Sequence, residues 1–180
     1  MSTFDELIDL DGNGRPIYGD SPFRVIKDVT FTGDNETVVT PIFTITGVVM
    51  VTRLWGVVTT TFGANHTDAH WRINDQTAHD QVITKSTTLD LSAISAGACI
   101  FKHGLAAAVA KYASADAAVF IEPTTLETQM FTPFVVTQKT GDIQTDIEYV
   151  YTTTDTPTTG AMRFYISYYP LTQNSKIEVA

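Results

Sequence analysis

Hydrophobic and polar residues alternate along much of this chain, most regularly in residues 141–171. In residues 143–151, Ile, Thr, Ile, Tyr and Tyr fall on one face, while Gln, Asp and Glu fall on the other. Residues 162–168 repeat this period-2 pattern, which is typical of half-buried strands. Pro157 and Gly160 interrupt the pattern between the two segments, as expected where the chain turns. The segment therefore predicts one long β-hairpin.

Shorter segments of the same kind precede it at roughly 8–12-residue spacing. The predicted strands are residues 24–32, 37–46, 69–74, 81–84, 88–91, 119–122 and 131–138. Residues 47–62 are almost continuously apolar or threonine, which predicts a strand buried on both faces or two strands meeting at a bend. This series predicts an all-β fold, either a β-sandwich or a jelly roll.

Three segments depart from the strand pattern. Residues 3–10 predict a short helix, because Thr3 can cap a first turn that carries Glu6. Residues 105–112 are rich in alanine and predict either a helix or a small-residue strand. The polar tail, residues 172–180, is expected to be extended or loosely attached.

The length of 180 residues is most economically explained by one packed domain. We predict an N-terminal arm or short helix over residues 1–22 and a single β-sandwich domain over residues 23–180. The 30 threonines support strands over helices, because β-branched side chains fit a pleated surface.

The net charge of −9 and the pI near 4.7 argue against nucleic acid as a partner, because phosphate contacts need clustered Lys and Arg. No apolar run approaches the length of a membrane span, so no membrane partner is expected. The acidic N-terminus lacks the positive region of a secretory signal, which favours synthesis in a cytoplasm. The single cysteine, Cys99, lies in an apolar run and is expected to be a buried, unreactive side chain.

One motif near the N-terminus has the spacing of a calcium-binding loop. Asp9, Asp11, Asn13 and, after Gly14, Asp20 supply oxygen at the spacing that such loops use. Pro16 and the absence of a terminal glutamate depart from the pattern. The preferred interpretation is therefore an acidic arm with a glycine-rich turn, and Ca²⁺ is the alternative.

A histidine-rich segment is the second candidate metal site. His66, Asp68 and His70 would share one face of a strand, and two histidines with one carboxylate are a known metal set. Along a straight strand these side chains spread over roughly 13 Å, too far to meet at one ion. Surface histidines are the preferred interpretation, and His79 belongs to the same region.

No nucleophile elbow, phosphate-binding loop or dinucleotide fingerprint occurs. His103 follows Cys99 by four residues without an obvious orienting partner, and Asp142, Asp146 and Glu148 are explained by a solvated polar face. We therefore predict no catalytic residue, no cofactor and no enzymatic activity.

The aromatic residues leave two interpretations open. They could form a platform on which sugar rings stack, or fill a core or subunit interface. These residues are Trp55, Trp71, Tyr149, Tyr151, Tyr165, Tyr168 and Tyr169.

Three segments resemble small β-sandwich decoration or cement proteins on the capsids of tailed bacteriophages. They are ITGVVMVTRLWGVVTTTF at residues 45–62, TPFVVTQKTGDIQTD at 132–146 and TTGAMRFYISYYPL at 158–171. The closest similarity is in the last segment, where Gly160 and Arg163 precede alternating tyrosines and a Pro-Leu end. The segments cover less than half of the chain and leave out the acidic arm and the histidines.

The resemblance implies a non-enzymatic virion protein on the capsid exterior, commonly a homotrimer, with the major capsid protein as its partner. The alternative is a carbohydrate-binding or receptor-binding module of a phage tail or fibre. Burial of the aromatic side chains would distinguish the two, because a sugar platform must be exposed.

Overall fold

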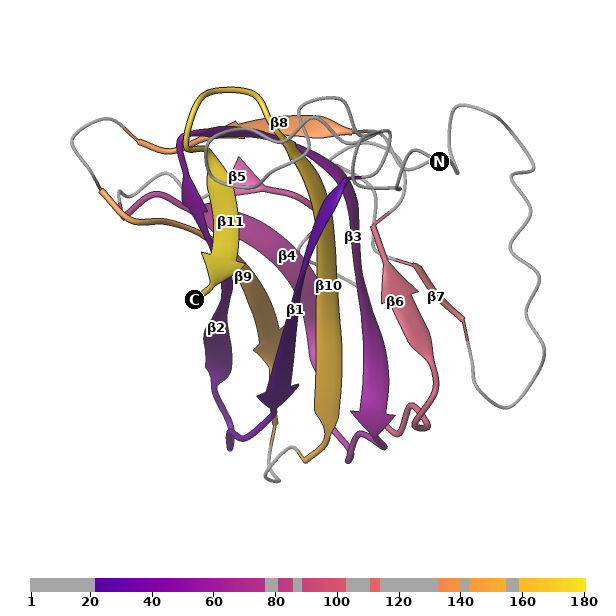
Figure 1. Cartoon of the computed structure of the whole chain (residues 1–180). Helices are drawn as coiled ribbons and strands as arrows, with labels where there is room; N and C mark the ends of the chain where they lie inside the picture. The colour runs from indigo at the N-terminus through magenta and orange to yellow at the C-terminus, as the bar shows by residue number, and fades with distance from the viewer. Residues whose placement is uncertain are drawn as a thin grey trace, which may run out of the picture.

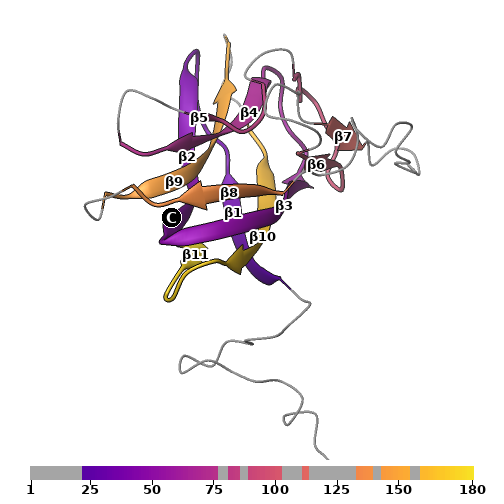
Figure 2. The same cartoon turned by 90° about the horizontal axis from the view of Figure 1, so that it is seen from above.

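A computed structural model describes residues 22–76, 81–85, 89–102, 111–113, 133–139, 143–154 and 159–180. All regular structure in these residues is β-strand, and two antiparallel sheets pack face to face as a β-sandwich (Figures 1 and 2). The predicted all-β class is confirmed, whereas the jelly-roll alternative stays a prediction. No helix among these residues is long and apolar enough to cross a membrane.

The larger sheet faces the viewer in Figure 1. Its order is β1 (Phe23–Thr30), β10 (Ala161–Pro170), β3 (Val48–Thr60), β6 (Cys99–Phe101) and β7 (Lys111–Ala113), and β8 (Phe134–Thr137) also pairs with β3. The order of the smaller sheet is β11 (Lys176–Val179), β2 (Thr37–Thr46), β9 (Thr145–Thr152), β4 (Thr67–Asn74) and β5 (Gln81–Val82). All pairs in both sheets are antiparallel.

The predicted hairpin of residues 141–171 is wrong. Its two arms are β9 and β10, which lie in different sheets, each flanked by other strands. Their inward side chains meet across the core, where the ring centroids of Tyr149 and Phe164 are 5.1 Å apart. The alternating pattern correctly predicted which side chains of β9 and β10 face inward. It carries no information about which other strand each of them pairs with.

The strands of both sheets contribute to one hydrophobic core. Its largest fully buried side chains are Trp71, Tyr149, Tyr151, Phe43, Phe62 and Phe164. Phe31 packs against several of these rings, with centroid distances of 5.2 Å to Tyr151 and 5.3 Å to Phe62. Large aromatic rings in edge contact account for much of the apolar area that stabilises the sandwich.

The continuous apolar run of residues 47–62 forms the single long strand β3. Its pairing with β10 shifts register between Ser167 and Tyr168, and the first part of β3 also pairs with β8. Gly56 lies in the middle of β3, opposite Phe164. A Cβ atom at this position would clash with Sδ of Met162, so the close packing of β10 side chains against β3 requires glycine here.

Several boundaries differ from the predictions. The expected strand at 88–91 is absent from its described part, residues 89–91, and β6 was not predicted. Residues 111–113, the end of the alanine-rich segment, form strand β7. The tail is not loosely attached: β11 pairs with β2, and Ile177 is only 3% exposed. The burial of Ile177 and the backbone pairing with β2 together hold this short edge strand in place.

Candidate functional site

A row of apolar side chains crosses the outer face of the larger sheet. Ile26 of β1 pairs with Tyr165 of β10, Tyr165 pairs with Trp55 of β3, and Trp55 pairs with Phe101 of β6. Side chains of directly paired residues point to the same face, and the next core-facing residues, Leu54 among them, point the other way. Ile26, Tyr165, Trp55 and Phe101 therefore lie side by side across four strands. We call these four residues the aromatic row.

The aromatic row remains partly accessible to solvent. Ile26 is 41% exposed, and the other three side chains are half-buried. The rings of Trp55 and Tyr165 stack on each other, with centroids 5.0 Å apart and planes 4° from parallel. One face of each ring is thus covered by the other, and the pair presents a rigid apolar ridge.

A shallow hollow of about 240 Å³ lies beside Trp55. Its lining residues are Arg53, Leu54, Trp55, Cys99, Phe101 and Lys102. Lys102 is nearly buried, with Nζ 5.5 Å from the centroid of the Phe134 ring, and burial lowers the pKa of its ammonium group. The hollow therefore combines apolar walls with two basic side chains.

Cys99 borders this hollow. It is half-buried, not fully buried as predicted, because it points to the outer face of β6. Burial raises the pKa of the thiol, so the thiolate fraction at neutral pH is low. The expectation of an unreactive side chain agrees with this environment.

Arginines flank the aromatic row. Ser167 of β10 lies between Arg24 of β1 and Arg53 of β3 in the pairing, and both arginines are exposed. On the other flank, Arg163 donates two hydrogen bonds to Asp28, of 2.7 and 2.9 Å. These hydrogen bonds lower the pKa of the Asp28 carboxyl group. Of the four charged side chains in these flanking positions, three are basic and one, Asp28, is acidic, in contrast to the acidic chain as a whole.

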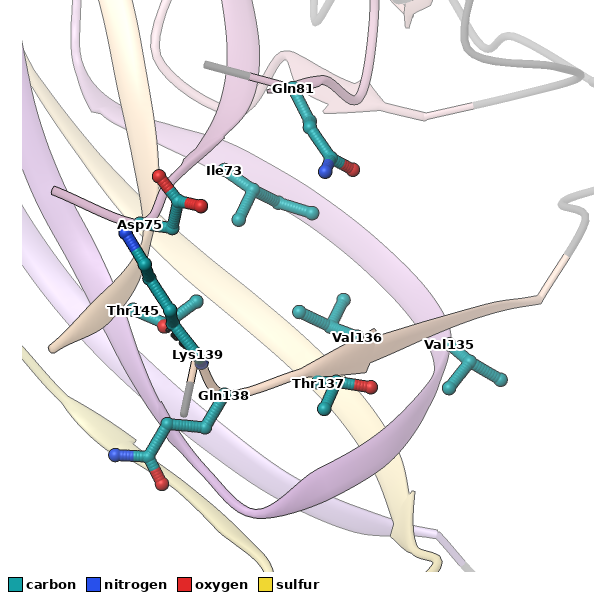
Figure 3. Close-up of a pocket in the computed structure, with 9 residues that line it drawn as sticks. All are labelled: Ile73, Asp75, Gln81, Val135, Val136, Thr137, Gln138, Lys139 and Thr145. Atoms are coloured by element: carbon teal, nitrogen blue, oxygen red, sulfur yellow. Dashed lines mark hydrogen bonds between the residues drawn. The ribbon is translucent and has the colours of Figure 1, made fainter. Parts of the chain in front are cut away.

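A second hollow, of about 440 Å³, opens between the sheets at the β8 end of the sandwich (Figure 3). Ile73 of β4 and Val136 of β8 line it from opposite sheets, with Asp75 and Lys139 at its rim. The Thr145 hydroxyl accepts a hydrogen bond from the backbone N–H of Lys139. Thr145 thus helps to hold the polar rim, and we assign this hollow no chemistry.

His66 lies inside the core, not on the surface as predicted. Its ring is fully buried between Tyr151 and Phe62, with centroid distances of 4.3 and 4.4 Å. Nε2 lies 3.0 Å from the hydroxyl oxygen of Tyr149, and Nδ1 has no hydrogen-bond partner among the described residues. Burial lowers the pKa of His66 to about 3, against a smaller opposing effect of Asp90. The neutral imidazole therefore acts as a core aromatic ring.

The other members of the histidine set do not join His66. His70 points to the outer face of β4, and its Nδ1 donates to the backbone oxygen of Asp68 at 2.7 Å. Within the described parts of the chain, no three His, Cys, Asp or Glu side chains are placed to hold a metal ion. The two-histidine, one-carboxylate arrangement considered from sequence is therefore not formed.

Asp146 and Glu148 are buried, so their assignment to a solvated polar face is wrong. They are 2% and 3% exposed in the central strand β9. Glu148 accepts hydrogen bonds from Arg72 Nε at 2.7 Å and Asn74 Nδ2 at 2.8 Å. Asp146 accepts one from the Thr44 hydroxyl at 2.7 Å. Polar side chains of the flanking strands thus cover both carboxylates, as buried charges require.

The tyrosines considered as a sugar platform separate into two groups. Tyr149, Tyr151 and Tyr168 are buried, as is Trp71. The Tyr151 hydroxyl donates to the backbone oxygen of Thr32 at 2.6 Å, and burial raises its pKa to about 12. Of the aromatic residues named above, only those on outward positions, such as Trp55 and Tyr165, remain available for contact.

The remaining predicted residues lie outside the described residues. They are the calcium-loop residues Asp9, Asp11, Asn13 and Asp20, together with His79, His103 and Asp142. The predicted arm and helix of residues 1–22 also fall there, except for Pro22.

Sequence reasoning did not identify the aromatic row, although its signal was present. Trp55 and Tyr165 occupy positions where alternation calls for polar residues, because their neighbours Leu54 and Phe164 face the core. A large aromatic residue at an outward position of a central strand is such a signal. Its partners could be found only when the strand register was known.

These features define a β-sandwich with an accessible aromatic row flanked by arginines. Comparisons of the chain with protein-family models, curated proteins and solved structures find no match.

Proposed function

We propose that this protein is a non-enzymatic structural component of a tailed-bacteriophage particle. In this role it decorates the capsid exterior and binds further copies of itself, as a trimer, and the major capsid protein. The observation that carries the proposal is the aromatic row, because a contiguous apolar ridge on an outer sheet face favours contact with another protein.

The placement of the segments that resemble decoration proteins supports this proposal. Residues 45–62 contain β3, residues 158–171 contain β10, and residues 132–146 contain β8. Both β10 and β8 pair with β3. The three segments therefore meet in the sheet that carries the aromatic row, which links the resemblance to one surface.

The carbohydrate-binding alternative rests on the hollow beside Trp55. Sugar sites typically offer an open aromatic face, whereas one face of Trp55 is covered by Tyr165. The charged side chains that line the hollow are Arg53 and Lys102, both basic. Both can donate hydrogen bonds to sugar hydroxyls, so the alternative is less well supported than a protein contact only because Tyr165 covers one face of Trp55.

Sedimentation velocity over a wide concentration range, together with co-sedimentation on capsids, tests the proposal. The capsids are assembled from the proposed partner, a major capsid protein of a tailed bacteriophage. The test variant is W55S/Y165S, and the matched control is V39S/V82S, which removes exposed apolar residues from the other sheet. The wild type and the control should form oligomers and bind capsids, and the test variant should bind at least about tenfold more weakly.

A wild-type protein that stays monomeric at high concentration and does not sediment with capsids would refute the proposal. Equal binding by the test and control variants would show that the aromatic row is not the contact surface.

A further inference from the structure

The flanks of the aromatic row carry positive charge on an acidic protein. The chain has a net charge of −9. In contrast, the outward charged side chains next to the row are Arg24, Arg53 and the pair of Arg163 with Asp28. Such a surface favours a partner that is both acidic and apolar, because opposite charges steer association and fix its register.

The hollow beside Trp55 limits the size of what can bind there. Its volume of about 240 Å³ is below the roughly 300–1,000 Å³ of sites that enclose small ligands. It is open at the surface and continuous with the aromatic row through Trp55 and Phe101. This shape suits one apolar side chain that is presented by a longer segment lying across the sheet.

The chain itself contains a segment of this chemistry. Residues 4–11 read FDELIDLD, in which four apolar and four acidic residues are interleaved. The apolar residues match the aromatic row and its hollow, and the carboxylates match Arg24 and Arg53. The two surfaces are complementary in both charge and apolar character.

The position where this segment joins the sandwich also fits. Strand β1 begins at Phe23, so residues 1–21 join the sheet next to Arg24, at the arginine-lined flank of the row. The ten residues 12–21 that connect this segment to the sheet can extend to about 35 Å, while two strand spacings from β1 to β3 span only about 10 Å. The connection is therefore long enough to carry the segment beyond the sheet of its own molecule.

We propose that residues 4–11 of one copy bind the aromatic row and the flanking arginines of a second copy. This inference rests on the proposed homo-oligomer and assigns its contact. Each copy then binds the aromatic row of one neighbour, and its own row is bound by the segment of another neighbour. In a closed ring every aromatic row is therefore covered. Charge attraction between copies overcomes the repulsion expected between molecules of net charge −9.

A charge exchange in the full-length chain tests the inference. The segment variant is D5K/E6K/D9K, and the surface variant is R24D/R53D. Each alone should self-associate at least about tenfold more weakly than the wild type in sedimentation velocity. An equimolar mixture of the two should regain pairwise association, because the intact segment of the surface variant can bind the intact row of the segment variant. A ring of three cannot close from two alternating variants, so heterodimers are the expected species. Circular dichroism spectra of both variants should match the wild-type spectrum, which checks that the β-structure is kept.

The control variant is K85D/K176D, which changes the same kind of charge at two positions away from the aromatic row. It should associate like the wild type. If the segment variant and the surface variant each oligomerise like the wild type, or if their mixture fails to regain association, the inference is overturned. In the first case the proposed capsid function still stands. It fails only if the wild type neither forms oligomers nor binds capsids.

Discussion

The buried imidazole of His66 predicts that this protein loses stability in mild acid. A protonated ring would carry a charge in an aromatic cluster, where Nδ1 has no acceptor among the described residues. Burial therefore lowers the pKa of His66 from 6.5 to about 3 in the folded protein. The unfolded chain keeps the ordinary value, so it binds a proton more readily than the folded chain does.

The sign and size of the effect follow from these two values. The contribution of neutral His66 to stability is complete above pH 6.5 and declines as the pH falls from 6.5 toward 3. One pKa unit corresponds to about 1.4 kcal/mol. Between pH 7.5 and 4.5, proton binding to His66 in the unfolded chain should therefore lower the free energy of unfolding by about 3 kcal/mol.

Urea unfolding followed by circular dichroism at both pH values measures this loss. In His66→Phe the ring that stacks on Tyr151 is kept, but no proton can bind. This variant should show about 3 kcal/mol less acid destabilisation than the wild type. The control is Phe62→Leu, which alters the same cluster without changing a titratable group, and its effect should be equal at both pH values.

This comparison separates the effect of His66 from other effects of acid, because those effects lower the stability of both proteins equally. If the wild type and His66→Phe lose the same free energy between pH 7.5 and 4.5, the reasoning is refuted. A second measurement is the imidazole NMR signal of His66, which should not titrate above pH 4 while the protein is folded.

Three further substitutions test the packing of the sandwich by urea unfolding at pH 7.5. Gly56→Ala should cost about 1–3 kcal/mol, because the added methyl group clashes with Met162; an unchanged midpoint would contradict the close packing of β3 and β10. Ile177→Ala should cost about 2–4 kcal/mol, and a neutral result would mean that β11 is not anchored in the core. Arg72→Met should cost about 1.5–3 kcal/mol, because buried Glu148 loses a charge-assisted hydrogen bond; a loss below this range would contradict a stabilising role for the pair.

The period-2 pattern predicted much of the strand structure. Residues 37–46 were predicted as a strand, and β2 spans Thr37–Thr46. Alternation reports which side chains face the core, and this information is local. The pairing of β9 and β10 is not local, because they lie in different sheets and each is flanked on both sides by strands distant in the sequence. This is why the hairpin prediction failed although the inward faces were right.

The candidate site was harder to predict for a related reason. Ile26 and Phe101 are 75 positions apart in the sequence and lie in one row only because β10 and β3 separate them in the sheet. Likewise, His66 was expected at the surface because its neighbours Asn65 and Asp68 are polar. Its burial depends on rings from other strands, which no local pattern contains.

The two tryptophans lie in different environments, so their fluorescence can report separately on unfolding and on binding. Trp71 is fully buried, whereas Trp55 is half-buried on the outer face, stacked on Tyr165. Fluorescence of Trp71 should shift to longer wavelength on unfolding, while emission from Trp55 should respond to whatever covers the aromatic row. With Trp71→Phe, the remaining indole would report binding at that surface without any attached dye, in the same molecule whose assembly is under test.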